Sequence, residues 1–200
     1  LSKLTSDSRI ECHGTIGNSF CGSIAGYIKT SEKLELVSCK SGENAAINLT
    51  YPAIKDGPYL RFGGLFGYVN VAGLNLQDCI NQADIDITIP AEVQTSQILV
   101  GGIAANISSE ADIEARIASC VNLGKITIDG LGRFGKNSVS ARPNCAGGIV
   151  GKCWVQNTGA NNTKVVFEDC KNNGDIHLVS HSATYYGQIS YLAGICADVS

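Results

Sequence analysis

The sequence lacks long apolar runs, clusters of one charge and helical periodicity. No stretch approaches the roughly 18 consecutive apolar residues of a membrane-spanning helix, so we predict no membrane span. The 15 basic and 18 acidic residues give a net charge of −3, and no basic run occurs, which argues against a nucleic-acid partner. Because 44% of the residues are hydrophobic, the chain can bury a sizeable core, and bulk disorder is excluded.

Familiar chemical motifs are missing as well. The sequence has no Walker loop, no dinucleotide fingerprint and no serine nucleophile elbow. Its nine cysteines include no Cys-x-x-Cys pair. We interpret the three histidines, His13, His177 and His181, as solvated surface residues, with metal ligation as the alternative. The sequence therefore predicts neither a cofactor nor a metal site.

What the chain does contain is an internal repeat. Its first motif has seven positions. They hold, in order, two small residues, an aliphatic anchor, any residue, a small residue, any residue and an apolar residue. The five copies are Gly22–Ile28, Gly63–Val69, Gly101–Ile107, Gly147–Cys153 and Ala193–Val199, with anchors at Ile24, Leu65, Ile103, Ile149 and Ile195.

A second motif, Cys-x-Asn-x-Gly-x-Ile-x-Ile, follows each of the first four anchors. Cys120–Ile128 and Cys170–Leu178 match it, Cys79–Ile87 has Ala83 in place of glycine, and Cys39–Leu49 has Ser41 in place of asparagine and two extra residues. We interpret Cys12–Ile16 as a worn copy that opens the chain. Two motifs in one fixed order indicate a tandem repeat of about 40 residues.

Each repeat contains three short runs with apolar residues at every second position, which is typical of β-strands. Ser109–Ser119 resembles a helix in isolation, but its sister segments alternate as strands do. We therefore predict an all-β fold, a right-handed parallel β-helix of about five coils with three short strands per coil. A β-propeller is the alternative, although each of its blades needs four strands.

The prediction assigns residues 1–200 to a single β-solenoid domain. The expected coils are roughly 1–20 (partial), 21–61, 62–98, 99–144, 145–190 and 191–200 (partial). Because the chain starts at Leu1 and ends at Ser200 within a repeat, we expect a segment of a longer protein, or a fragment cut at convenient points.

Equivalent residues should stack in columns along such a solenoid. The residue before each motif cysteine is Ser or Asp, and we expect a corner there that turns the cysteines Cys39, Cys79, Cys120 and Cys170 into the interior. We interpret them as buried small hydrophobes rather than metal ligands or disulfides. Asn81, Asn122 and Asn172 should mark a bend with left-handed backbone and a ladder of stacked amides.

The two motifs together resemble the GLUG repeats. Gly63-Gly-Leu-Phe-Gly67 and Gly147-Gly-Ile-Val-Gly151, each followed by the cysteine motif, carry the resemblance, which covers nearly the whole chain. GLUG repeats occur in large bacterial surface proteins, notably of Bacteroides, in adhesins and beside the catalytic domain of immunoglobulin A peptidases. The resemblance implies a cell-surface or secreted stalk or adhesin-like solenoid. The zinc signature His-Glu-x-x-His of the peptidases is absent.

Two groups of residues are candidates for a site. On the outward side of the third strands we expect a polar face with Asp84, Asp86, Lys125, Asp175 and His177. It is a charge-paired solvent face, a carboxylate patch of a polysaccharide-processing enzyme or a ligand-binding face. The position after each anchor is also expected to point outward and, being apolar, to need a cover; it is occupied by Ala25, Phe66, Ala104, Val150 and Cys196.

The second group is aromatic and lies in or beside the variable loops. Its members are Tyr51, Tyr59, Phe134, Trp154, Tyr185 and Tyr186. They either recognise a glycan or a partner protein, or they cover the edge of the core. The expected function is that of a non-enzymatic adhesin-like binding module or stalk outside the cell. The alternatives are a lyase or glycosidase, and a subunit that self-associates end to end.

Overall fold

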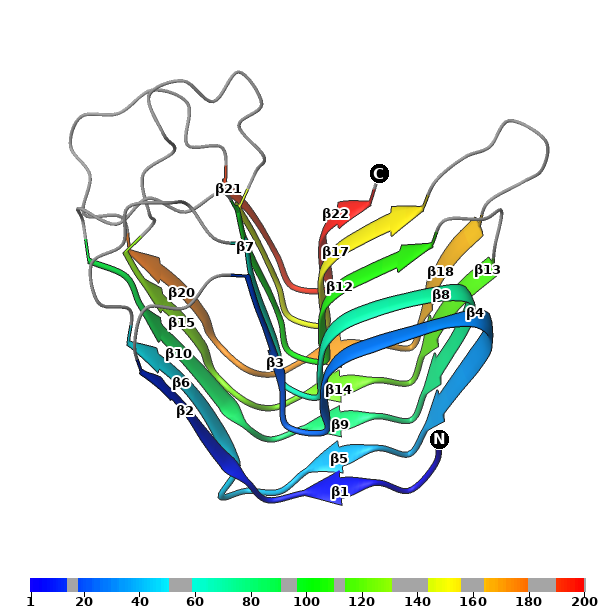
Figure 1. Cartoon of the computed structure of the whole chain (residues 1–200), viewed down its shortest axis with the longest axis horizontal. Helices are drawn as coiled ribbons and strands as arrows, with labels where there is room; N and C mark the ends of the chain where they lie inside the picture. Colours follow the sequence, from blue (N-terminus) through cyan, green and yellow to red (C-terminus); the bar gives the residue numbers. More distant parts are fainter. Residues whose placement is uncertain are drawn as a thin grey trace.

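The structure of the chain is a computed structural model that describes residues 1–13, 18–50, 59–90, 97–109, 114–130, 144–155, 164–179 and 190–199. Within these ranges the regular structure is β-strand, without any helix (Figure 1). The described residues accordingly include no helix of the length and apolarity that crossing a membrane requires. The fold is all-β, as predicted.

The strands form four parallel sheets (Figure 1). The base sheet contains β1 (Thr5–Ser6), β5 (Lys40–Ser41), β9 (Ile80–Asn81), β14 (Val121–Asn122) and β19 (Lys171–Asn172). The outer sheet contains β2 (Arg9–His13), β6 (Ala46–Thr50), β10 (Asp84–Thr88), β15 (Ile126–Asp129) and β20 (Ile176–Val179). The inner sheet contains β3 (Ser19–Gly22), β7 (Tyr59–Gly63), β11 (Gln97–Gly101), β16 (Asn144–Gly147) and β21 (Ser190–Ala193).

The fourth sheet, here the wide sheet, contains the strands that follow each anchor and lead to the next motif cysteine. They are β4 (Ala25–Val37), β8 (Phe66–Gln77), β12 (Ala104–Ser109), β13 (Glu114–Ala118), β17 (Val150–Val155), β18 (Lys164–Glu168) and β22 (Cys196–Val199). Equivalent residues of successive repeats are partners in every sheet, for example Ile47 with Ile85 and Ile85 with Ile126. This parallel stacking is that of a β-solenoid and excludes the propeller, whose blades are separate sheets.

The prediction of three strands per repeat was wrong, because it placed the inner sheet within variable loops. The inner-sheet strands lie at the ends of those segments, directly before the anchors. In β11 every residue from Gln97 to Gly101 is buried. A strand covered on both faces has no apolar–polar alternation, so the period-2 signal used to find strands is absent there.

Corners break the alternation before each motif cysteine, as expected, but their left-handed backbone was not predicted there. Ser38, Asp78, Ser119 and Asp169 have φ values of 54°, 53°, 52° and 51°. Cys39, Cys79 and Cys120 are fully buried in consequence. The expectation of left-handed asparagines was wrong, because Asn81, Asn122 and Asn172 lie in short extended strands of the base sheet instead.

Two hydrophobic cores run along the solenoid. The outer core lies between the inner and outer sheets and includes Phe62, Val100, Ile85 and Ile126. The wide core lies within the bent wide sheet. Phe66, Ala104 and Val150 are fully buried in this wide core. The prediction that they point outward was therefore wrong. Each anchor lies in the bend before the strand and is buried in the same core as the residue after it, so the strand alternation counted from the anchor does not hold there.

Between the two cores lies the waist, which we define as Gly64, Gly102 and Gly148 together with the asparagine ladder. In this ladder, Ser41 Oγ donates to Asn81 Oδ1, Asn81 Nδ2 to Asn122 Oδ1, and Asn122 Nδ2 to Asn172 Oδ1, each at 2.8 Å. A Cβ on Gly64, Gly102 or Gly148 would collide with the amide of Asn81, Asn122 or Asn172, respectively. The amide ladder is confirmed, and it explains why the second position of the small pair is glycine in these repeats.

The first copy of the cysteine motif begins earlier than predicted. Ser6 is paired with Ser41, Ile10 with Ile47 and Cys12 with Leu49. Cys12 therefore occupies the last aliphatic position of the motif and not its first position. The sequence Cys12-His-Gly resembles the start of the motif, but the residue at the first motif position in this coil is Leu4. The Leu4 carbonyl accepts the Lys40 N–H.

Candidate functional site

The predicted polar face lies on the outer sheet. Asp86, Thr127 and His177 are register partners on β10, β15 and β20. Asp84 and Lys125 lie side by side, but the Asp84 carboxylate accepts the backbone N–H of Lys125 at 2.7 Å. Asp175 precedes β20 on the same face, and its carbonyl accepts the Ile126 N–H. The face is therefore a regular array on paired strands.

Charge alternation continues toward the start of the chain on this same face. Arg9 and Glu11 form an ion pair at 2.8 Å, with 65% and 47% of their side chains exposed. Ion pairs this exposed contribute little to stability. Neither of the two cavities described below is lined by Asp84, Asp86, Lys125, Asp175 or His177.

The predicted aromatic group is only partly accounted for by the structure. Tyr51, Phe134, Tyr185 and Tyr186 lie outside the described residues. Trp154 is 39% exposed near the end of β17. Tyr59 begins β7 and is half-buried, with the Arg61 guanidinium 5.4 Å from its ring centroid. The structure thus separates Trp154, on the wide sheet, from Tyr59, on the inner sheet.

Arg61 is the centre of an aromatic cluster that the sequence did not predict. Its guanidinium also lies 5.1 Å from the ring centroid of Phe20 and 4.8 Å from that of Tyr68. Tyr27 stacks on Tyr68 with a centroid separation of 5.1 Å and on Phe20 at 5.5 Å. Tyr27 and Tyr68 occupy the same position in successive repeats, so the stacking of repeats places their rings beside each other. Phe20 and Arg61 belong to the inner sheet, which the sequence did not reveal.

The wide sheet carries a groove that is lined by described residues. This groove has a volume of about 480 Å³ and is lined by Lys33, Ala72, Gly73, Leu74, Asn75, Glu114 and Arg116. Lys33 is the register partner of Gly73, at the point where the pairing of β4 and β8 shifts. Gly73 therefore leaves a gap in a column that otherwise carries the long side chains of Lys33, Glu114 and Lys164.

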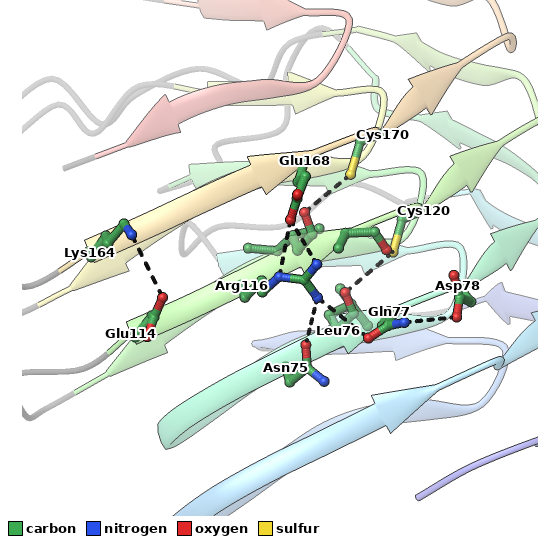
Figure 2. A network of polar contacts seen from close by, with 12 residues as sticks. Asn75, Leu76, Gln77, Asp78, Glu114, Arg116, Cys120, Lys164, Glu168 and Cys170 are labelled. Atoms are coloured by element: carbon green, nitrogen blue, oxygen red, sulfur yellow. Dashed lines mark hydrogen bonds and ion pairs between the residues drawn. The ribbon is translucent and has the colours of Figure 1, made fainter.

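One side of the groove is fixed by a network around Arg116 (Figure 2). Its Nη2 and Nε donate to Glu168 Oε2 at 2.7 and 3.2 Å. Its Nη1 donates to Asn75 Oδ1 at 3.5 Å and to Gln77 Oε1 at 3.4 Å. The guanidinium thus bridges three neighbouring strands, which holds it in one orientation beside Asn75. Glu114 is held more loosely, 3.9 Å from Lys164 Nζ.

The opposite side of the groove is formed by Lys33. Among the described residues, no hydrogen bond or ion pair engages its ammonium group. The groove therefore offers an ammonium, a fixed guanidinium, an amide and a carboxylate around a floor of backbone. Such a mixture of donors and acceptors suits a ligand rich in hydroxyl or carboxylate groups.

Sequence reasoning missed this groove completely. Considered one by one, its polar lining residues are ordinary residues of a solvent-facing strand; they are Lys33, Asn75, Glu114 and Arg116. The available signal was Gly73, a glycine directly before a predicted strand run, and a glycine in a strand often marks a bulge or a close approach of a ligand.

The nine cysteines are free thiols. Burial raises the pKa of Cys145 and of Cys153 to about 12 and that of Cys196 to about 11. Cys79 and Cys120 donate to backbone carbonyls, for example from Cys120 Sγ to Ala118 O at 3.3 Å. The described residues include no group of three or more His, Cys, Asp or Glu arranged to hold a metal ion.

The second cavity is small, about 10 Å³, and lies in the outer core beside Cys145 and Leu178. It is too small to hold more than one water molecule.

Comparison with protein-family models, curated proteins and solved structures found no match for this chain. The wide-sheet groove is therefore the site that the geometry favours for binding.

Proposed function

We propose that this chain is a non-enzymatic binding module of an extracellular or cell-surface protein, built as a right-handed solenoid of about five GLUG-type coils. The parallel stacks and the two repeated motifs support the coil count, and the resemblance of the motifs supports the location. A solenoid of this kind presents a rigid surface along its length, on which a ligand can be bound without rearrangement of the backbone.

The observation that carries the proposal is the groove over Gly73. Arg116 is oriented by Glu168, Asn75 and Gln77, and Lys33 is available on the opposite side. Charge-assisted hydrogen bonds from these two cations would bind sugar hydroxyl or carboxylate groups, while Glu114 and Asn75 would accept from hydroxyls. The proposed ligand class is therefore a glycan. Acidic sugars are favoured by Lys33, because Arg116 and Glu114 already have the partners Glu168 and Lys164 of opposite charge.

The test is a glycan array probed with the whole chain and with Gly73→Gln. The added Cβ would lie 3.3 Å from Lys33 Cγ, a flexible side chain, so the variant is expected to fold while its amide fills the groove. Loss of array binding by at least about tenfold is expected, which corresponds to about 1.4 kcal/mol. Asp86→Asn, on the outer sheet, is the matched control and should bind like the wild type.

A Tyr185→Ala/Tyr186→Ala variant distinguishes the groove from the loops. If the tyrosine variant loses binding while Gly73→Gln retains it, the groove assignment is wrong and recognition lies on the loops. If the wild type binds no glycan on the array, the chain is a passive stalk and the binding proposal fails.

A further inference from the structure

Cys12 and Cys21 form a close pair of thiols in the first coil. Their Sγ atoms are 3.6 Å apart. Cys12 lies on β2 of the outer sheet and Cys21 on β3 of the inner sheet, and both pack against the outer core. The contact therefore spans two sheets across one core, whereas the stacked motif cysteines lie side by side at the corner between the wide and base sheets.

The same two positions hold no thiol in the stacked repeats. Cys12 is the partner of Leu49, followed in register by Ile87, Ile128 and Leu178. Cys21 is the partner of Phe62, followed by Val100, Ala146 and Leu192. The two positions are thus both cysteine in the first coil. In the coils stacked on it, both positions hold aliphatic residues, phenylalanine or alanine. A need for apolar core packing alone does not require both to be cysteine together.

We propose that Cys12 and Cys21 form a disulfide when the protein meets an oxidising small-molecule disulfide, and that this bond joins the outer and inner sheets. Cys12 and Cys21 belong to strands of different sheets, so the bond would tether these sheets across the outer core and restrict the unfolded chain.

The chemistry is a thiol–disulfide exchange in two steps. The Cys12 thiol loses its proton, and its sulfur attacks one sulfur of the oxidant, whose other half leaves as a thiolate. Cys21 then loses its proton and attacks Cys12 Sγ in the mixed disulfide, and the second half of the oxidant leaves. The two cysteines are oxidised, and the oxidant is reduced to two thiols. Burial raises the pKa of Cys21 to about 12, so Cys21 is the slower nucleophile and suits the intramolecular step.

The thiols of the motif-cysteine column are poorer candidates. Cys79, Cys120 and Cys170 each donate to a backbone carbonyl of a neighbouring wide-sheet strand, at 3.6, 3.7 and 3.4 Å. They lie in register along one column, so their Cα–Cβ bonds are nearly parallel, which opposes the dihedral angle of about 90° that a disulfide requires. The proposal therefore predicts one bond and seven remaining thiols.

The experiment treats the native full chain with oxidised glutathione, followed by alkylation in denaturant and intact-mass measurement. Seven alkylated cysteines and a cross-linked peptide pair containing Cys12 and Cys21 are expected, and nine after treatment with a reductant. Hydrogen exchange of β2 and β3 should slow by about tenfold in the oxidised protein, while β11 and β12 exchange unchanged.

Cys12→Leu is the matched variant, because leucine occupies the equivalent position at Leu49. It should carry eight alkylated cysteines with or without oxidant, and its exchange should not respond to oxidation. Nine alkylated cysteines in the oxidised wild type, or a cross-link through Cys79 or Cys120, would overturn the proposal. The wild-type mass measurement decides the question even if the variant does not fold.

Discussion

The waist and the outward face of the outer sheet derive from the same repeat but differ in how strongly neighbouring coils constrain them. At the waist, Asn122 bonds to both Asn81 and Asn172, and Gly102 packs directly on its amide. On the outer face, the column that contains Asp84 holds alanine at Ala46 and aspartate at Asp84 in adjacent repeats. Stacking therefore fixes residue identity where two motifs meet and leaves it free where one side of the strand faces water.

The first coil supports this interpretation. The position equivalent to Gly64 is Ser23, and the ladder position that lies beside Asn81 is Ser41. Ser23 Oγ donates to the carbonyl of Gly64. The second residue of the small pair and the ladder residue are thus both serine in the first coil, in place of glycine and asparagine. This is expected if the side chain at one position limits the space at the other.

Gly102→Ala is the substitution that should break the waist most severely. The new Cβ would collide with the carbonyl oxygen of Gly148 and with the amide of Asn122, and backbone cannot move aside as a flexible side chain can. We expect a loss of about 3 kcal/mol in the free energy of unfolding, measured by urea denaturation.

Gly194→Ala is its matched control, because the same motif position there has no atom within 4 Å of the added Cβ. Its unfolding free energy should stay within about 0.5 kcal/mol of the wild type. Equal losses in the two variants would show that the backbone conformation at this position, and not contact with the asparagine ladder, selects glycine.

The sequence predicted those features that one repeat shares with the next. The two motifs were sufficient to infer parallel stacking, the buried cysteine column and the amide ladder of Asn81, Asn122 and Asn172. The repeat also predicted the aliphatic columns such as Ile85 and Ile126, both fully buried. Each of these follows from identical residues recurring at a fixed place.

Features that depend on two surfaces meeting were missed. Strand β11 of the inner sheet was hidden because it is buried on both faces. Phe66 was assigned outward because the alternation is broken at the bend at Leu65. The groove is created by the side chain that Gly73 lacks between Lys33 and Glu114. Such a gap becomes visible only when the register of neighbouring strands is known.

Cys153→Val should have an intermediate effect that depends on pH. Burial raises the pKa of Cys153 from 9.0 to about 12, so the thiol stays protonated in the folded protein while the unfolded chain ionises. Its stabilising contribution is complete below pH 9 and is lost as the pH rises through 12, by about 1.4 kcal/mol per pH unit. The variant should therefore lose less stability between pH 9 and 11, as measured by urea denaturation.

Valine suits this position, because Cys153 is the register partner of Ile107 and Val199. At pH 7 we expect a change below about 1 kcal/mol. Ile107→Val is the control, since it alters the same column without removing a thiol and should keep the wild-type pH dependence. An unchanged alkaline slope in Cys153→Val would mean that the other buried thiols dominate the response.

Asp84→Ala should have the smallest effect and tests the other half of the comparison. The exposed Asp84 carboxylate accepts the Lys125 N–H at 2.7 Å, but water can replace it there, and the neighbouring repeat carries Ala46 at the equivalent position. We expect a loss below about 1 kcal/mol in urea denaturation and unchanged glycan binding. A loss above about 2 kcal/mol would mean that the outer face is constrained as tightly as the waist. Loss of binding would instead move recognition from the groove to the carboxylates of the outer sheet.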